Sequence, residues 1–134
     1  MIPFQTRQPP EQVPELPTLQ APDGSRVRLL LEGSGGAMAQ FTLAPRQISL
    51  AVAHRTIEEI WFFLSGTGRM WRRLAQQEEV VPVSAGVSLT IPTGTHFQFR
   101  SDSDEPLVAL GVTMPPWPGE QEAYVVQGPW VASD

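Results

Sequence analysis

Proline and glycine interrupt this chain so often that long regular elements are excluded. The 134 residues include 14 prolines and 11 glycines, and the segments between them are short apolar runs with a two-residue period. Proline breaks helices and central strands, and both residues favour turns. About nine or ten short strands, roughly ten residues apart, are therefore expected, without a helical period. This pattern predicts an all-β sandwich or barrel.

The same turn signals divide the chain into an arm and one folded unit. Six of the prolines fall within residues 1–22, which predicts an extended proline-rich N-terminal arm. Asp23-Gly24 marks a turn, and residues 23–134 are expected to form a single barrel with a C-terminal proline-rich tail. The predicted strands cover residues 26–32, 37–43, 46–54, 59–64, 69–74, 80–83, 87–91, 96–100, 107–114 and 123–126.

Composition and charge argue against several classes of protein. The chain has no cysteine, so it can form no disulfide, no cysteine-bound zinc site and no thiol nucleophile. Its net charge of −5 argues against nucleic acid as a partner. No apolar run approaches the ~20 residues of a membrane span, and the first residues lack a signal-peptide pattern. We therefore expect a cytoplasmic protein that binds neither membrane nor nucleic acid.

Two polar stretches beside apolar strands contain the candidate functional residues. In the first, His54 and Glu59 precede the run 60–64, which ends at a turn over 65–68. This run is apolar at every position, which predicts a strand buried on both faces. The only other histidine, His96, follows a Pro-Thr-Gly turn. The functional hypothesis depends on whether the two stretches meet in space, where a β-barrel would place a ligand or a metal.

The spacing in these stretches resembles the two sequence motifs of the cupins, a family of small barrels. The first motif has a glutamate, six residues and a glycine, matched by Glu59 and Gly66. The second has a glycine, five residues and Pro-x-Gly, matched by Gly86 and the triplet ending at Gly94. The resemblance spans about residues 46–101. It implies a cupin-type double-stranded β-helix, or jelly-roll, barrel.

The resemblance also implies a metal, which cupins hold by a His-x-His pair, the glutamate and a histidine of the second motif. A four-residue gap before Glu59 puts Val52 and His54 at the pair, so the first ligand is replaced. A three-residue gap puts Ala53 and Arg55 there, and neither residue binds metal. With either gap, the chain lacks at least one ligand of the family's pair.

The second motif leaves its own ligand position open. His96 comes one residue earlier than the family pattern requires, and without a gap Phe97 occupies the position of the ligand. A shift of one residue turns a side chain to the other face of a strand. If His54, Glu59 and His96 converge, they form a two-histidine, one-carboxylate site suited to iron, manganese, zinc or nickel. If they do not, the histidines are structural and hold no metal.

Strand alternation predicts the residues that would touch a bound molecule. Trp61 and Phe63 share a face with Glu59 and are expected to make the pocket aromatic. On the later strand, Gln98 and Arg100 share the face of His96, so Arg100 would meet an anionic substrate if His96 points inward. If Phe97 points inward instead, the pocket is more apolar and His96 lies at its rim. Glu59 and His96 are the catalytic candidates, as a general base or as metal ligands. The predicted substrate-binding residues are Trp61, Phe63, Phe97, Gln98 and Arg100.

These expectations describe a small cupin barrel that binds a small organic molecule in an aromatic-lined pocket. Two functions remain open besides a purely structural or interaction role, which would need an occluded barrel. One is a metal-dependent enzyme of the oxygenase, isomerase or lyase type, since the fold alone does not choose among these reactions. The other is a metal-free binding protein without catalysis, which the missing first histidine favours. The resemblance further implies a homodimer in which the N-terminal arm reaches over the partner.

Overall fold

The computed structural model describes residues 4–9 and 19–134, and within them every regular element is a β-strand. This confirms the predicted all-β class. Residues 1–3 and 10–18 of the predicted arm lie outside the described residues. In the part of the chain that is described, no helix could cross a membrane. The strands are β1 (Leu19–Gln20), β2 (Arg26–Glu32), β3 (Ala37–Leu43), β4 (Val52–His54), β5 (Glu58–Ser65), β6 (Thr67–Leu74), β7 (Gln77–Ser84), β8 (Ser88–Ile91), β9 (His96–Ser101), β10 (Leu107–Met114) and β11 (Ala123–Val125).

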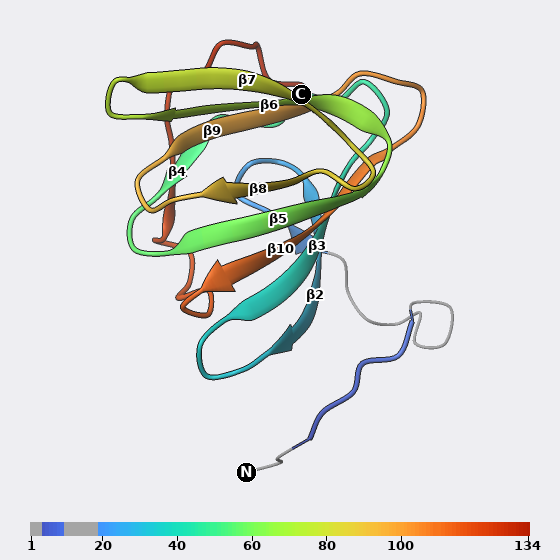
Figure 1. Cartoon of the computed structure of the whole chain (residues 1–134), viewed down its shortest axis with the longest axis vertical. Helices are drawn as coiled ribbons and strands as arrows, with labels where there is room; N and C mark the ends of the chain where they lie inside the picture. Colours follow the sequence, from blue (N-terminus) through green and yellow to red (C-terminus); the bar gives the residue numbers. More distant parts are fainter. Residues whose placement is uncertain (1–3, 10–18) are drawn as a thin grey trace.

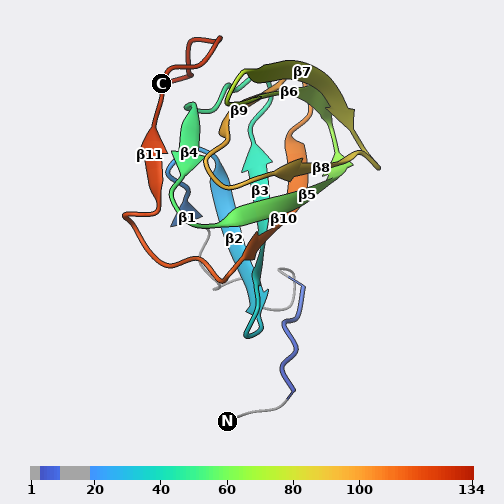
Figure 2. The same cartoon turned by 60° about the vertical axis from the view of Figure 1, so that its left-hand side comes forward.

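The strands form two antiparallel sheets that together enclose the core (Figure 1). The six-stranded sheet has the order β1-β2-β3-β10-β5-β8, and the five-stranded sheet has the order β11-β4-β9-β6-β7. Figure 2 shows β4 and β11 side by side at the edge of the second sheet. The largest buried side chains between the sheets are Trp61, Phe63, Phe97, Phe99, Leu43 and Met70.

β5 shows how the sequence separates the inside of the barrel from the outside. Its residues alternate in burial, so that Glu59, Trp61 and Phe63 face the interior. Ile60 and Phe62 face outward, and their side chains remain 47% and 46% exposed. The prediction of a strand buried on both faces is therefore wrong, because no described part of the chain covers this face of the sheet.

The glycines of the two motifs have backbone conformations that would be strained with any other residue. Gly66 has a φ of 82°, and a Cβ there would lie 2.2 Å from the carbonyl oxygen of Pro106. Gly86 and Gly94 also have positive φ values, 94° and 84°, which glycine adopts without steric cost. The amide of Gly94 donates to the carbonyl of His54 at 3.1 Å. This hydrogen bond ties the turn of the second motif to the strand of the first.

The predicted strand over residues 46–54 forms only at its end, as β4. The residues before β4 cross between the sheets, and their amides bond to different partners. The amide of Ser49 donates to the carbonyl of Phe99, and that of Leu50 donates to the carbonyl of Asp23. Because these partners belong to different segments, the crossing residues do not form one continuous ladder.

The hairpin of β6 and β7 is longer than predicted. β7 begins at Gln77 and continues through Pro82, although only residues 80–83 were expected to be extended. A proline is tolerated there because β7 is the edge strand of its sheet. The hairpin turns at Ala75, whose φ is 56°. The polar residues 77–79 therefore belong to the strand and not to the turn.

Candidate functional site

A cavity of about 430 Å³ lies inside the barrel, between β2, β3 and β5 of one sheet and β4 and β9 of the other. This volume falls within the range of small-molecule sites. Aromatic and aliphatic side chains make up most of its wall. The aromatic residues are Phe41, Trp61, Phe97 and Trp117, and the titratable residues among those described are Asp23, His54, Glu59 and Glu120.

His54 and Glu59 meet in the wall of this cavity. His54 is the last residue of β4 and Glu59 is near the start of β5, so the two side chains approach from opposite sheets. His54 Nδ1 lies 3.0 Å from Glu59 Oε2, although the two atoms are not aligned as a hydrogen bond. The indole of Trp61 donates to Glu59 Oε1 at 3.2 Å. Glu59 is thereby held between two neighbours, while His54 Nδ1 is buried and has no hydrogen-bond partner among the residues that the structure describes.

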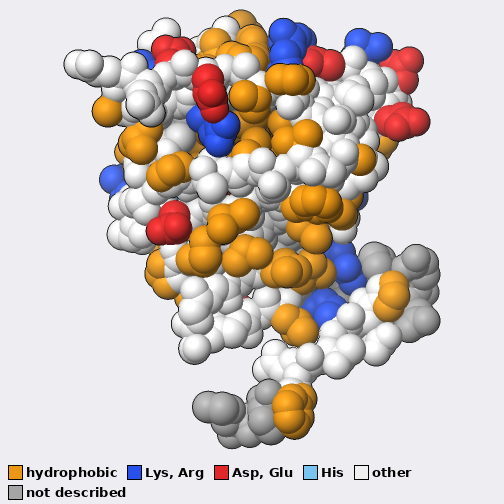
Figure 3. Space-filling model, in the orientation of Figure 1, with side chains coloured by type: hydrophobic (Ala, Val, Ile, Leu, Met, Phe, Trp, Pro, Cys, Tyr) orange, Lys and Arg blue, Asp and Glu red, His pale blue; other side chains and the backbone are white. Residues whose placement is uncertain are grey.

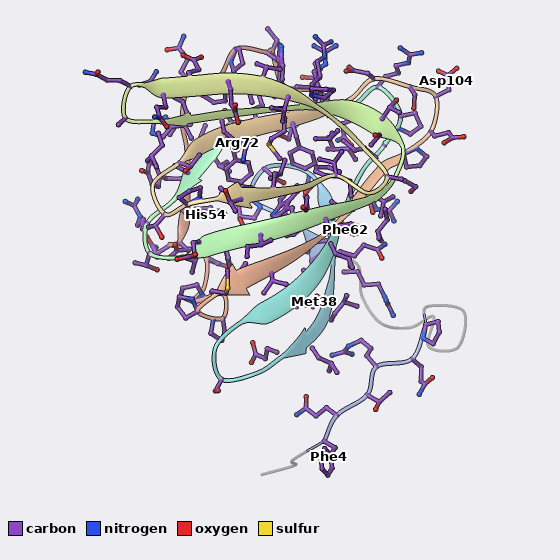
Figure 4. The ribbon with its side chains drawn as sticks, in the orientation of Figure 1. Phe4, Met38, His54, Phe62, Arg72 and Asp104 are labelled. Carbon is purple, nitrogen blue, oxygen red and sulfur yellow. The ribbon has the colours of Figure 1, made fainter. Side chains whose placement is uncertain are left out.

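Two aromatic rings fix the imidazole of His54. The ring of Phe97 stands edge-on to it with centroids 5.3 Å apart, and the ring of Trp117 does so at 5.2 Å. From the sequence, Trp117 belongs to the proline-rich stretch that ends the last central strand, and it is expected to make a dimer or core contact and not to contact a cofactor. No periodic signal exists in such a stretch, so its return to the cavity could not be inferred. Figure 4 labels His54 beside the start of β5.

Asp23 is a member of the site that the sequence predicts only as part of a turn. Its Oδ1 accepts hydrogen bonds from the amide of Ser25 at 2.9 Å and from its hydroxyl at 2.6 Å. Burial and the negative charge of Glu59 raise the pKa of Asp23, although the Ser25 hydrogen bonds and His54 oppose this. The Asp-Gly-Ser signal correctly indicates a turn, but nothing in it shows that the carboxyl points into the cavity.

Glu122 holds the segment after β10 against the loop that follows His54. Its carboxylate accepts hydrogen bonds from the amide and hydroxyl of Thr56, both at 2.6 Å, and from the amide of Ile57 at 2.9 Å. Burial acts to raise the pKa of Glu122, but these hydrogen bonds outweigh it and lower the pKa. The segment that carries Trp117 and Glu120 is therefore fixed at its far end.

The structure does not bring His96 to this site. His96 is absent from the cavity wall, and its register partner is Arg73 on β6, with both residues on the outer face of the sheet. Phe97 occupies the inward position, so the ungapped alignment of the second motif describes the structure. The predicted convergence of His54, Glu59 and His96 is thus not observed, because the one-residue shift points the imidazole away.

Gln98 and Arg100 also lie on the outer face and not in the cavity. Gln98 Nε2 donates to the carbonyl oxygens of Ser49 and Trp130, at 2.8 and 2.9 Å. Arg100 donates to Asp102 at 2.7 Å and lies over the ring of Trp130. Both side chains hold the C-terminal tail on the sheet. Their predicted contact with a substrate is not supported by these positions.

Of the predicted aromatic contacts, Trp61 and Phe97 line the cavity and Phe63 does not. Phe63 faces inward but lies in the packed core, fully buried. Trp61 stacks on Phe41 with centroids 4.8 Å apart and rings nearly parallel. This stack needs Gly111, because a Cβ there would come within 2.6 Å of Phe41 and 2.9 Å of Trp61.

The residues at the family's metal-ligand positions can be tested against the structure. With the alignment that the structure supports, these positions are Val52, His54, Glu59 and Phe97, and all four line the cavity. Two of them are apolar and cannot coordinate a metal. Across the described ranges, no group of three or more potential ligands is arranged to hold a metal ion. These residues therefore do not fit a metal held by three or four protein ligands.

The comparisons with known proteins agree with the fold. The family described as Cupin domain matches residues 39–113. A search of curated proteins found no match. Among solved structures, Bacillus subtilis oxalate decarboxylase at pH 4.6 is 17% identical with a TM-score of 0.71, over 86% of this chain and 31% of that chain.

Two further structures give a similar result. The Bacillus subtilis oxalate decarboxylase studied for its Mn(II) centres is 20% identical with a TM-score of 0.63, over 71% of this chain and 26% of that chain. A predicted oxalate decarboxylase from Thermotoga maritima is 20% identical with a TM-score of 0.58, over 67% of this chain and 79% of that chain. The chain spans less than a third of the length of the Bacillus enzymes. At such identities the likeness concerns the fold.

Proposed function

We propose that the barrel of this chain, which belongs to the cupin family, binds a small, largely apolar organic molecule without a resident metal. The observation that supports this is the composition of the cavity wall. Two positions that hold metal ligands in the family are Val52 and Phe97 here. Their side chains extend the apolar surface formed by Phe41, Trp61 and Trp117. A pocket of this kind gains its affinity from buried apolar area.

In this proposal His54 and Glu59 orient the polar group of the ligand. Both are buried, and within residues 4–9 and 19–134 His54 Nδ1 has no hydrogen-bond partner. A buried polar atom without a partner costs free energy, which a bound ligand could recover by completing the hydrogen bond. The pair is also within reach for proton exchange with a ligand. The proposed function is ligand binding. Proton transfer between this pair and the bound ligand would be an additional activity.

A metal-dependent enzyme is the second candidate. It is favoured by the 3.0 Å separation of His54 Nδ1 and Glu59 Oε2, since two donor atoms so close can share one divalent cation. Two protein donors make a weaker and less selective site than the three or four of a closed metal centre. The two candidates therefore differ in whether binding of an organic ligand requires metal.

A neutral aromatic probe tests the first candidate. Phenethyl alcohol should bind, as followed by the fluorescence of Trp61 and Trp117 or by titration calorimetry. Ala39→Leu, which adds bulk to the cavity wall, should weaken binding about tenfold, equivalent to ~1.4 kcal/mol. Gln40→Leu is the matched control, because the neighbouring side chain on β3 points to the other face. Equal affinity of the two variants would place the probe elsewhere.

The metal requirement is decided with the same probe. We expect binding to be unchanged after treatment with EDTA and dialysis. Elemental analysis of protein purified without chelator should then show only traces of first-row metals. If EDTA abolishes binding and Mn²⁺ or Zn²⁺ restores it, the second candidate replaces the first. His54→Ala would in that case also lose the restored metal.

A further inference from the structure

Among the described residues that line it, the cavity has an excess of acidic side chains that no arginine or lysine balances. Asp23 and Glu59 are 5% and 2% exposed, and Glu120 lies exposed at the rim. The chain contains no lysine, and its nine arginines all lie in the described ranges. None of these arginines lines the cavity. Among the described residues that line the cavity, His54 is the only one whose side chain can carry a positive charge.

Two buried carboxylates next to one imidazole form an incomplete electrostatic arrangement. The charge of Glu59 acts on Asp23, and together with burial it raises the pKa of Asp23. Carboxylates removed from water are costly unless a cation or several donors offset their charge. The donors present are Ser25 for Asp23 and Trp61 for Glu59. These bonds orient the carboxyl groups, but they supply no positive charge.

Further buried polar atoms in the wall also lack partners. His54 Nδ1 and Thr113 Oγ1 are buried without a hydrogen bond from any described residue, and both residues line the cavity. Thr113 stands opposite Glu59 in the pairing of β10 with β5, so the two side chains share the inner face. The hydroxyl of Thr113 can accept a hydrogen bond from a ligand, and Nδ1 of His54 can accept one in the tautomer that carries its proton on Nε2. A donor-rich ligand group would therefore find acceptors around Glu59.

The aromatic part of the wall suits the same kind of group. Trp61 and Trp117 flank the polar residues, the first through its bond to Glu59 and the second through its contact with His54. Aromatic rings attract ammonium groups as well as apolar bodies, most strongly where water is excluded. Carboxylates and aromatic rings together favour an organic cation over an anion.

We infer that the cavity selects organic ammonium compounds, with an apolar body against the aromatic wall and the ammonium group between Asp23 and Glu59. This deepens the proposed function and rests on it. An ammonium group supplies the positive charge that the wall lacks and donates up to three hydrogen bonds to the acceptors there. A carboxylate ligand would instead face two buried negative groups. A small dianion such as oxalate is therefore the ligand class that this wall disfavours.

Three probes with similar aromatic bodies test the selection: phenethylamine, phenethyl alcohol and phenylacetate. At pH 8 we expect phenethylamine to bind about tenfold more tightly than the alcohol, and phenylacetate about tenfold more weakly, each step equal to ~1.4 kcal/mol. If phenylacetate binds as tightly as the amine, the inference is overturned, while the proposed function survives. If none of the probes binds, the proposed function itself fails. The order of the three affinities is measured on the wild-type protein alone, so this test does not depend on whether a variant folds.

Asp23→Asn locates the effect. Asparagine retains an oxygen that can accept the Ser25 hydrogen bonds, so the turn should persist, and circular dichroism checks the fold. The affinity for phenethylamine should fall about tenfold, while that for phenethyl alcohol changes less than about threefold. Asp104→Asn removes an exposed carboxylate that does not line the cavity, so it is the control and should change amine binding less than about threefold. If the variant still prefers phenethylamine to phenethyl alcohol as strongly as the wild type does, Asp23 is not the source of the preference.

Discussion

Asp23 is buried in the cavity wall, where its ionised carboxylate destabilises the folded state but can bind a ligand. Because burial and Glu59 raise its pKa, the folded state retains a proton at pH values where the unfolded chain has lost it. The unfolded value is near 3.8. As the pH rises through the window above that value, the carboxyl group must ionise inside the cavity, and the folded state becomes less stable. A residue kept at such a cost is expected to serve binding.

Asp23→Asn should therefore raise the melting temperature at neutral pH. Asparagine does not ionise, so the variant lacks the cost that the wild type meets above pH 3.8. We expect the two proteins to melt together below that pH, and the variant to melt a few degrees higher near pH 7. Thermal unfolding followed by circular dichroism between pH 3.5 and pH 8 measures this difference.

Asp104→Asn is the matched control for this series. Asp104 is almost fully exposed and its contact with Arg46 is a surface ion pair, which contributes little to stability (Figure 4). Its substitution should leave the difference from the wild type close to zero at every pH. An Asp23→Asn variant that is less stable than the wild type at pH 7 would show that the carboxylate is compensated in the folded state.

The two-residue period could predict individual side chains only where the strand register was certain. It placed Glu59, Trp61 and Phe63 on one inward face of β5, and the structure shows them there. For His96 the same period gave two outcomes, since a shift of one residue reverses the face. Asp23 could not be predicted at all, because the direction of a turn side chain depends on tertiary packing.

At the scale of elements, the segment between β10 and β11 forms part of the cavity wall. It contributes Trp117 and Glu120 to the wall, although it has no regular structure. Glu122 anchors it to the loop after β4 by three hydrogen bonds from Thr56 and Ile57. The order of this segment therefore depends on one buried carboxylate more than on strand pairing.

Glu122→Gln should destabilise the barrel by about 1–3 kcal/mol at pH 7, because the amide cannot accept all three hydrogen bonds with the same strength. The pKa of Glu122 is lowered on folding, so its contribution is present above the unfolded value of 4.5. It is lost as the pH falls through the folded pKa. In urea unfolding, the free energy of unfolding of the variant should be well below that of the wild type at pH 7. The difference should be smaller at pH 3.5.

Glu120→Gln is the control within the same segment. Glu120 is exposed, and its substitution should change the free energy of unfolding by less than about 0.5 kcal/mol. Hydrogen exchange adds a local measurement, since amides of residues 115–125 should exchange faster in Glu122→Gln. A stability loss that is equal at both pH values would contradict the role of the ionised carboxylate.

Most strands could be predicted because apolar runs bounded by glycine and proline fix their ends. β2, β3 and β10 have the predicted bounds. The segment before β4 could not be predicted, because its amides bond to β9 and to the turn at Asp23 instead of one partner strand. Its apolar alternation is that of a strand, but its hydrogen bonds are those of a crossing connection.

For the molecule as a whole, the outer face of the six-stranded sheet is apolar over several strands. The register places Val112 of β10 between Ile60 of β5 and Met38 of β3, and it places Leu110 beside Phe62. Figure 3 shows hydrophobic side chains gathered over β5 and β10. The C-terminal tail lies on the other sheet, where Trp130 bonds to Gln98. This uncovered face is the surface through which we expect the predicted homodimer to form.

Two copies of this face can pack against each other, because apolar sheet faces align with a small rotation set by their twist. We expect the chain to elute at twice its single-chain mass in size-exclusion chromatography with light scattering. Phe62→Glu places a charge at the centre of the face and should give a monomer. Val80→Glu adds the same charge to an equally exposed residue on β7 and should remain dimeric. A wild-type monomer at tens of micromolar, or two variants of equal mass, would show that this face does not join two copies.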